Sequence, residues 1–138
     1  MESRLFFYGT LMAELGHPLA REWHAALSAG EKGWVEGRLW ALPDPQGWYP
    51  ALVPGEGRVM GTVHCPLAAF DAAMLAAMDR YEGEAYRRLP VTVRVASGEI
   101  AAQAYVWQEA LPEGAVALED GDFAAFLARS GEQAYRGA

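Results

Sequence analysis

The chain has little cysteine and little positive charge, and each shortage disfavours a class of protein. Cys65 is its only cysteine, so it can form neither an intrachain disulfide nor a zinc site built from several thiolates. Lysine and arginine together number 11 against 18 aspartates and glutamates, which leaves a formal net charge of −7. Because phosphate-rich partners need clustered cations, we expect neither nucleic acid nor a membrane surface as a partner.

Long apolar runs are also missing. No stretch approaches the roughly 20 apolar residues that a membrane-spanning helix requires, and the start of the chain lacks the apolar core of a signal peptide. We therefore expect a cytoplasmic protein. Its 138 residues suit a single domain over residues 1–138, and a composition that is 52% hydrophobic and 21% charged is typical of a chain that folds around a core.

The first half of the sequence indicates short strands separated by turns. Residues 4–8 are apolar and β-rich, which predicts a strand buried on both faces. A helix is predicted around residues 19–27, after Pro18. Further strands are predicted over residues 33–42, 49–53 and 59–64, with turns at residues 43–47 and 54–57. Pro50 cannot donate a backbone hydrogen bond, so its strand is expected at a sheet edge or a bulge.

The second half changes period. Between residues 67 and 81, four large side chains recur at spacings of four, four and three, which predicts one face of an α-helix. They are Phe70, Met74, Met78 and Tyr81. Gly83 follows where a left-handed C-cap residue is expected.

The remaining residues indicate a hairpin and a last helix. Strands are predicted over residues 86–95 and 101–107, joined by a turn at residues 97–98. Asp120 and Asp122 are capping candidates for a helix that contains Phe123. About six strands and two or three helices predict an α+β domain with a barrel-like, mostly antiparallel sheet and packed helices.

Two segments could carry chemistry. In residues 7–12 an apolar strand stops at a glycine followed by a hydroxyl residue, and such a turn can aim backbone N–H groups at a carboxylate or an oxyanion. An ordinary exit from a strand is the alternative. Glu82 stands near the apolar face of the predicted helix, where partial burial would raise its pKa from about 4.3 toward neutrality, as a general acid/base requires. The alternative, which the residues alone favour, is a solvated acid like its neighbours Asp79 and Glu84.

Histidine and cysteine offer weaker candidates. His17, His24 and His64 lack the spacing of a metal-ligand motif, so packing or surface roles are expected. Cys65 lacks the surroundings of a nucleophile and is expected to be a small buried thiol.

Several short motifs resemble, in order, those of the γ-glutamylcyclotransferase-like (AIG2-like) family. They are Phe-Tyr-Gly-Thr-Leu at residues 7–11, Tyr-Pro-Ala-Leu at 49–52, Gly-Thr-Val at 61–63, Met-Asp-x-x-Glu-Gly at 78–83 and Tyr-Arg-Arg at 86–88. The resemblance covers roughly residues 5–107. It implies the family's fold, a mixed α/β structure with a small barrel-like sheet.

The resemblance also implies a site. Glu82 would be the catalytic acid/base. The residues implied to bind substrate are Tyr8, Gly9, Thr10, Leu11, Tyr86 and Tyr105. Met12 departs from the family, which often carries an arginine after the Tyr-Gly-Thr-Leu loop.

The implied reaction is an intramolecular acyl transfer that needs neither a metal nor an organic cofactor. It cyclises the γ-glutamyl group of a γ-glutamyl amine or peptide to 5-oxoproline and releases the amine, so a small γ-glutamyl molecule is the expected partner. Two alternatives stay open. One is a small-ligand-binding domain of the same fold without turnover, and the other is an acyltransferase or amide-cleaving enzyme that acts on another substrate.

Overall fold

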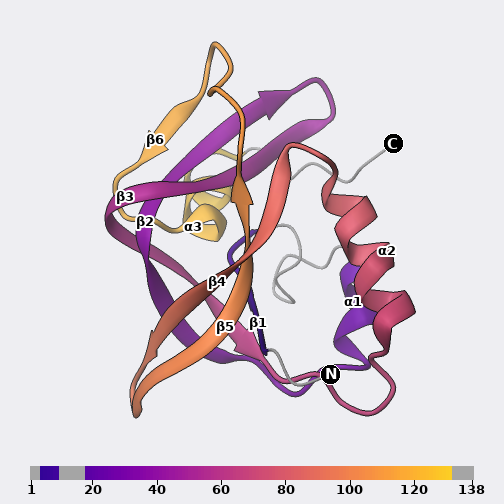
Figure 1. Cartoon of the computed structure of the whole chain (residues 1–138). Coiled ribbons are helices and arrows are strands. Elements are labelled where there is room, and N and C mark those ends of the chain that lie inside the picture. Colours follow the sequence, from indigo (N-terminus) through magenta and orange to yellow (C-terminus); the bar gives the residue numbers. More distant parts are fainter. Residues whose placement is uncertain (1–3, 10–17, 132–138) are drawn as a thin grey trace.

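A computed structural model describes residues 4–9 and 18–131, and five of its strands close into a barrel (Figure 1). These strands are β1 (Arg4–Phe7), β2 (Glu31–Asp44), β3 (Gly47–His64), β4 (Tyr86–Val95) and β5 (Gly98–Trp107). They pair in the order β3-β1-β5-β4-β2, and β2 returns to β3. Only the β1–β5 pair is parallel. A short sixth strand, β6 (Val116–Leu118), pairs with β2. The expected barrel-like α+β fold is confirmed.

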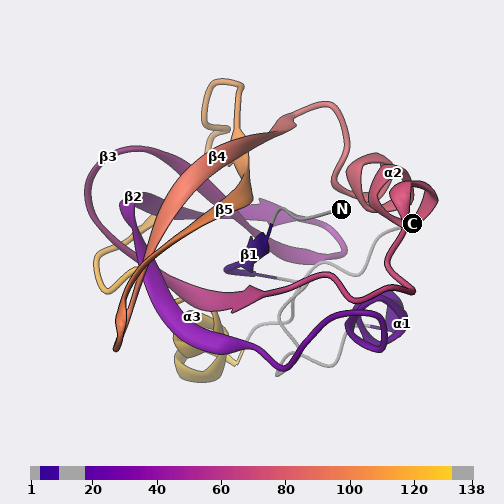
Figure 2. The same ribbon diagram turned by 60° about the horizontal axis from the view of Figure 1, so that its bottom comes forward.

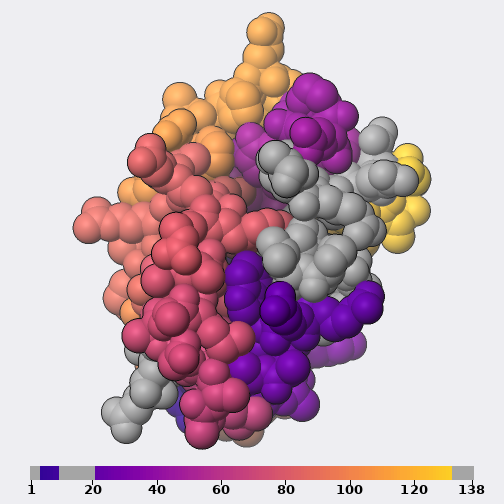
Figure 3. All heavy atoms as spheres, turned by 90° about the vertical axis from the view of Figure 1, so that its right-hand side faces the viewer, coloured from indigo at the N-terminus to yellow at the C-terminus, as the bar shows by residue number. Residues whose placement is uncertain are grey.

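Three helices pack on this barrel. They are α1 (Pro18–His24), α2 (Ala72–Glu82) and α3 (Phe123–Ser130). Helices α1 and α2 lie next to each other on one side of the barrel, whereas α3 lies apart from them (Figures 1, 2 and 3). Phe123 and Leu127 of α3 are buried in the barrel core. No helix in the described part of the chain is long and apolar enough to cross a membrane.

Strand β1 is buried on both faces, as its apolar sequence predicts. Phe6 and Tyr8, the residue directly after β1, belong to the core inside the barrel. Leu5 and Phe7 alternate with them and pack into a second core that contains Met78 of α2. Because strand side chains alternate between faces, this short strand joins the barrel to its helical side.

Two expectations about β3 have different outcomes. The turn predicted at residues 54–57 is wrong, because β3 continues through it, with a register shift opposite residues 36–38 of β2. Gly55 and Gly57 adopt positive φ angles there, so these glycines serve a bulge rather than a turn. Over residues 47–53, β3 pairs only with β2, so Pro50 occupies a local sheet edge, as its missing N–H predicts.

The helix ends follow their capping residues. Helix α2 begins after its N-cap Asp71, whose carboxylate accepts a hydrogen bond from the Met74 backbone N–H at 2.9 Å, so it starts later than the predicted residue 67. Gly83 follows the helix with a φ of 89° and a ψ of 177°, so the expected left-handed cap is wrong, although its N–H still bonds to the Asp79 carbonyl. Asp122 caps α3 as predicted.

Replacing Gly61 by alanine should destabilise the fold, because β1 lies directly against this position. An added Cβ would lie 2.2 Å from the Phe7 carbonyl oxygen, and a backbone atom cannot move aside without disturbing β1. We expect Gly61→Ala to lower the free energy of unfolding by about 2–3 kcal/mol, measured by urea denaturation. Met60→Ala, at the exposed neighbouring position, is the control, with an expected loss below about 1 kcal/mol. Equal urea midpoints for the two variants would contradict the close approach.

Candidate active site

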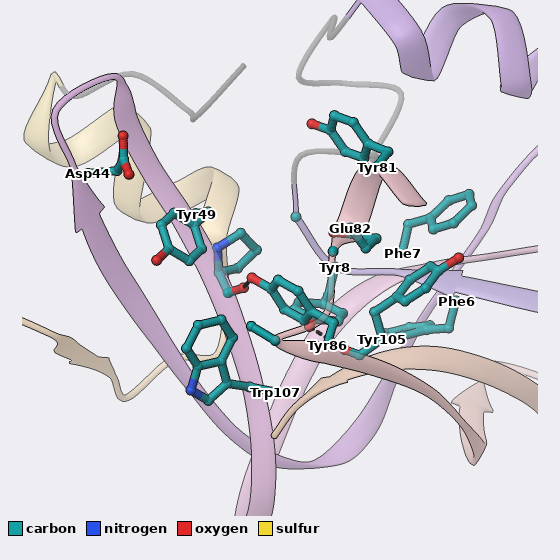
Figure 4. Close-up of a pocket in the computed structure, with 14 residues that line it drawn as sticks. Phe6, Phe7, Tyr8, Asp44, Tyr49, Tyr81, Glu82, Tyr86, Tyr105 and Trp107 are labelled. Carbon is teal, nitrogen blue, oxygen red and sulfur yellow. Dashed lines mark hydrogen bonds between the residues drawn. The ribbon is translucent and has the colours of Figure 1, made fainter. Parts of the chain in front are cut away.

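A cavity of about 340 Å³ lies where the end of β1, the β2–β3 hairpin, the end of α2 and strand β5 meet (Figure 4). Its lining includes Phe6, Phe7, Tyr8, Gly9, Asp44, Tyr49, Pro50, Tyr81, Glu82, Gly83, Tyr86, Tyr105 and Trp107. Aromatic rings form most of these walls. A concave, largely apolar cavity with a few polar groups is typical of a small-molecule site.

Glu82, the last residue of α2, lines this cavity. Its carboxyl group makes no hydrogen bond or ion pair with any described residue, and the residue is half-buried. Burial among the cavity walls, followed by the negative charge of Asp79, raises the pKa of Glu82 to about 8. Near pH 8 this side chain therefore exists in both protonation states, so it can accept and return a proton.

Asp79, one helical turn earlier, is held in its ionised form. Partial burial alone would raise its pKa, but hydrogen bonds from Arg88 and Tyr105 lower the pKa below its ordinary value. Arg88 donates to both carboxylate oxygens at 3.0 and 3.2 Å, and the Tyr105 hydroxyl donates at 2.5 Å. These contacts fasten the end of α2 to strands β4 and β5, and so they position Glu82.

The tyrosine hydroxyls beside Glu82 are bonded to backbone groups. The Tyr8 hydroxyl donates to the Tyr105 carbonyl and accepts from the Leu52 N–H at 3.3 Å. The Tyr86 hydroxyl donates to the Pro50 carbonyl at 2.5 Å. Burial raises the pKa of both Tyr8 and Tyr86, so these side chains remain neutral at physiological pH and hold the cavity walls together.

Gly9 brings the end of β1 against the hairpin. A Cβ at this position would lie 2.0 Å from Cγ of Pro50, so no larger residue fits without moving that wall. The backbone at Gly9 can therefore approach a ligand in the cavity closely.

The structure brings most of the predicted site residues together. Glu82, Tyr8, Gly9, Tyr86 and Tyr105 all line the cavity. Thr10 and Leu11 lie outside the described residues, as do Met12 and His17.

Several cavity residues were missed by the sequence analysis, and three of them carry polar groups. Trp107 follows Tyr105 at a spacing of two in β5, and its buried Nε1 has no hydrogen-bond partner among the described residues. Tyr49 belongs to the quoted Tyr-Pro-Ala-Leu motif, which was not assigned a site role. Asp44 lies in a Pro-Asp-Pro sequence that reads only as a turn, so no signal indicated it.

The other candidates lie away from the cavity lining. His64 is buried, and its Nδ1 lies 3.0 Å from the Ser28 carbonyl oxygen. Burial is the main cause that lowers the pKa of His64. Cys65 is only half-buried, so the expectation of a buried thiol is wrong; its sulfur accepts a hydrogen bond from Arg4 near the surface. Within residues 4–9 and 18–131, no group of three or more His, Cys, Asp or Glu side chains is placed to hold a metal ion.

Comparison with known proteins identifies similar sequences and folds. The family model described as gamma-glutamyl cyclotransferase, AIG2-like, matches residues 5–125. An uncharacterised protein from Pyrococcus horikoshii is 22% identical, with 94% of this chain and 96% of that chain covered and a TM-score of 0.68. An AIG2-like protein from Mus musculus is 22% identical over 81% of both chains, with a TM-score of 0.63.

A third similar structure belongs to a much longer protein. Allophanate hydrolase from Kluyveromyces lactis is 16% identical, with 94% of this chain but 22% of that chain covered and a TM-score of 0.71. At these identities the structural likenesses show the fold alone. No curated protein matches the sequence significantly.

Replacing Glu82 by glutamine should stabilise the protein at high pH. A carboxyl group whose pKa is raised on folding contributes stability that is fully present below its unfolded pKa, near 4.5, and that is lost as the pH rises through about 8. Glutamine carries no charge and avoids this loss. In urea denaturation, the stability advantage of Glu82→Gln over the wild type should therefore grow between pH 5 and pH 9.

Glu84→Gln is the matched control, because Glu84 is an exposed carboxylate two residues along the chain that does not line the cavity. Its stability difference from the wild type should stay nearly constant over the same pH range. A constant difference for Glu82→Gln as well would contradict the burial of that carboxyl group.

Proposed function

The chain belongs to the gamma-glutamyl cyclotransferase, AIG2-like family, and on this premise we propose that it converts a γ-glutamyl amine or peptide into 5-oxoproline and a free amine. The observation that carries the proposal is the Glu82 carboxyl group, which lines an aromatic cavity without a hydrogen-bond partner among the described residues and has a pKa of about 8. A single carboxyl group with this pKa is sufficient for the chemistry, because the substrate supplies its own nucleophile.

The reaction begins with the substrate folded inside the cavity. In a γ-glutamyl amide the α-amino nitrogen lies a few bonds from the γ-carbonyl carbon, so attack closes a five-membered ring. Holding the two atoms close together avoids much of the translational and rotational entropy loss that slows a bimolecular reaction. Tyr86 and Tyr105 both line the cavity, whose volume of about 340 Å³ limits how far the γ-glutamyl group can extend.

Glu82 moves two protons in turn, from the attacking nitrogen to the leaving nitrogen. Its carboxylate form takes a proton from the substrate α-ammonium, which frees the nitrogen lone pair for attack on the γ-carbonyl carbon. The new C–N bond forms a tetrahedral oxyanion. The ring nitrogen still carries one proton too many at this point. Protonated Glu82 gives its proton to the amide nitrogen, and the regenerated carboxylate takes the second proton from the ring nitrogen as the oxyanion collapses and the old C–N bond breaks. Glu82 passes this second proton to the departing amine, which leaves as an ammonium ion, so atoms and protons balance and water is not consumed.

Backbone N–H groups are assigned to the oxyanion or to the substrate carboxylate. Gly9 lines the cavity, and its close contact with Pro50 keeps the end of β1 at this wall. The family resemblance assigns the same role to Thr10 and Leu11. Fixed N–H donors stabilise developing negative charge without reorganisation, which lowers the barrier for acyl transfer.

The direct test is incubation with a panel of γ-glutamyl amides, followed by detection of 5-oxoproline by mass spectrometry. We expect the wild type and Glu84→Gln to release 5-oxoproline, and Glu82→Gln to lose turnover by at least about a hundredfold, because general acid–base catalysis contributes that much. Wild-type rates of 5-oxoproline release by Glu82→Gln would contradict the role of Glu82 as the acid/base. Binding of 5-oxoproline without turnover of any amide would instead favour a ligand-binding domain.

The pH dependence should report the environment of Glu82. Since the carboxylate form starts the reaction, kcat/KM should rise with pH and level off above about 8. Asp79→Asn removes the negative charge that adds to the effect of burial on this pKa, yet its amide oxygen can still accept from Arg88 and Tyr105. The rise in kcat/KM should therefore move to lower pH in Asp79→Asn and stay in place in Glu84→Gln. An unshifted profile in Asp79→Asn would contradict the electrostatic coupling.

A further inference from the structure

The cavity contains a second carboxylate, which the reaction described above does not use. Asp44 lies at the end of β2, and Figure 4 shows it across the cavity from Glu82, with Tyr49 between them. It is half-buried, and its Oδ1 accepts a hydrogen bond from the Gln46 N–H at 2.9 Å, which fixes the hairpin turn. Its Oδ2 has no partner among the described residues.

Aromatic rings line the part of the cavity next to Asp44. The Trp107 ring lies 6.0 Å from the Tyr49 ring and 5.1 Å from the Tyr86 ring, measured between centroids. Aromatic faces attract cations, and a carboxylate beside them attracts cations as well.

No positive side chain balances these groups. Among the described residues that line the cavity there is no lysine, arginine or histidine. The lining does include two carboxyl groups, those of Asp44 and Glu82. An anionic end group placed here would be repelled by Asp44 and would find no cation. A cationic end group would be attracted by both the rings and the carboxylate.

We propose that Asp44, Tyr49 and Trp107 form a subsite for a positive charge on the leaving amine, an inference that rests on the proposed function. The scissile amide nitrogen must lie near Glu82, so the rest of the leaving group extends toward the opposite end of the cavity. The substrates are then γ-glutamyl amides of diamines, with a free ammonium group at the far end, rather than γ-glutamyl amides of α-amino acids.

The indole N–H of Trp107 would favour an anionic end group instead of a cationic one. Its buried Nε1 is a donor without a partner among the described residues and would suit an acceptor such as a carboxylate. Figure 4 places this nitrogen on the edge of the indole ring remote from Tyr86 and Glu82, so it does not face the path between the two carboxylates. The geometry thus favours the cation, and the test below includes an anionic substrate.

The test compares three γ-glutamyl amides of similar length: those of 1,4-diaminobutane, n-pentylamine and 4-aminobutanoate, whose far ends are positive, neutral and negative. In the wild type and in Glu84→Gln, kcat/KM should be about tenfold higher for the positive than for the neutral amide, and lowest for the negative one. In Asp44→Asn, the ratio of positive to neutral should fall toward one. Asparagine still accepts the Gln46 hydrogen bond through its side-chain oxygen, so the turn is retained.

A binding measurement separates this subsite from the proposed function. Calorimetric titration with 1,4-diaminobutane alone should show binding to the wild type that weakens about tenfold in Asp44→Asn. Such binding without turnover of any amide would overturn the proposed function and leave the subsite intact. Turnover without a cationic preference, or with the same preference in Asp44→Asn, would overturn the subsite alone. A preference for the negative amide would overturn the cation subsite and point to Trp107. If no amide is turned over and no Asp44-dependent binding is measured, both the proposed function and the subsite are overturned.

Discussion

Two carboxyl groups one turn apart on the same helix are held in opposite states, and the candidate site depends on that difference. Asp79 is paired with a guanidinium and a phenol, so its charge persists. Glu82 has no such partner among the described residues, and the persistent charge of Asp79 adds to the effect of burial on its pKa. The same contacts that fasten α2 to the sheet therefore also adjust the proton affinity of its last residue.

This arrangement requires the barrel. Arg88 and Tyr105 face each other on β4 and β5, where they are paired in register, and this pairing presents both donors to Asp79. The cavity also requires β1 to pass close to the hairpin, which Gly9 allows, and close to β3, which Gly61 allows. Because β1 is buried on both faces, a shift that relieves either contact would disturb two cores at once. The positions of the cavity walls are thus tightly constrained by packing.

Sequence reasoning succeeded where local periodicity or a capping residue determines the structure. The two-faced strand at residues 4–7 and the N-cap of α3 follow from residue type alone. It failed at residues 54–57, because glycine and proline signal a turn and a bulge in the same way, and only pairing with β2 distinguishes them. Strand β6 was missed because three residues carry no period, and its existence depends on pairing with β2. Asp44 was missed for a related reason: a turn residue becomes a cavity residue only when the barrel closes.

The two ends of the cavity differ in how they are built. Glu82 lies at the end of a helix that is fastened by charged hydrogen bonds to Asp79, so the backbone that carries the proposed acid/base is anchored to the sheet. Asp44 and Tyr49 lie on a hairpin where β3 pairs with only one neighbour, so fewer backbone hydrogen bonds fix this end. Proton transfer requires accurate placement of the reacting atoms, whereas attraction of a charged end group falls off slowly with distance and tolerates looser placement. Under the proposed function, a fold with this division would keep its chemistry at one end while residues of a hairpin select the amine at the other.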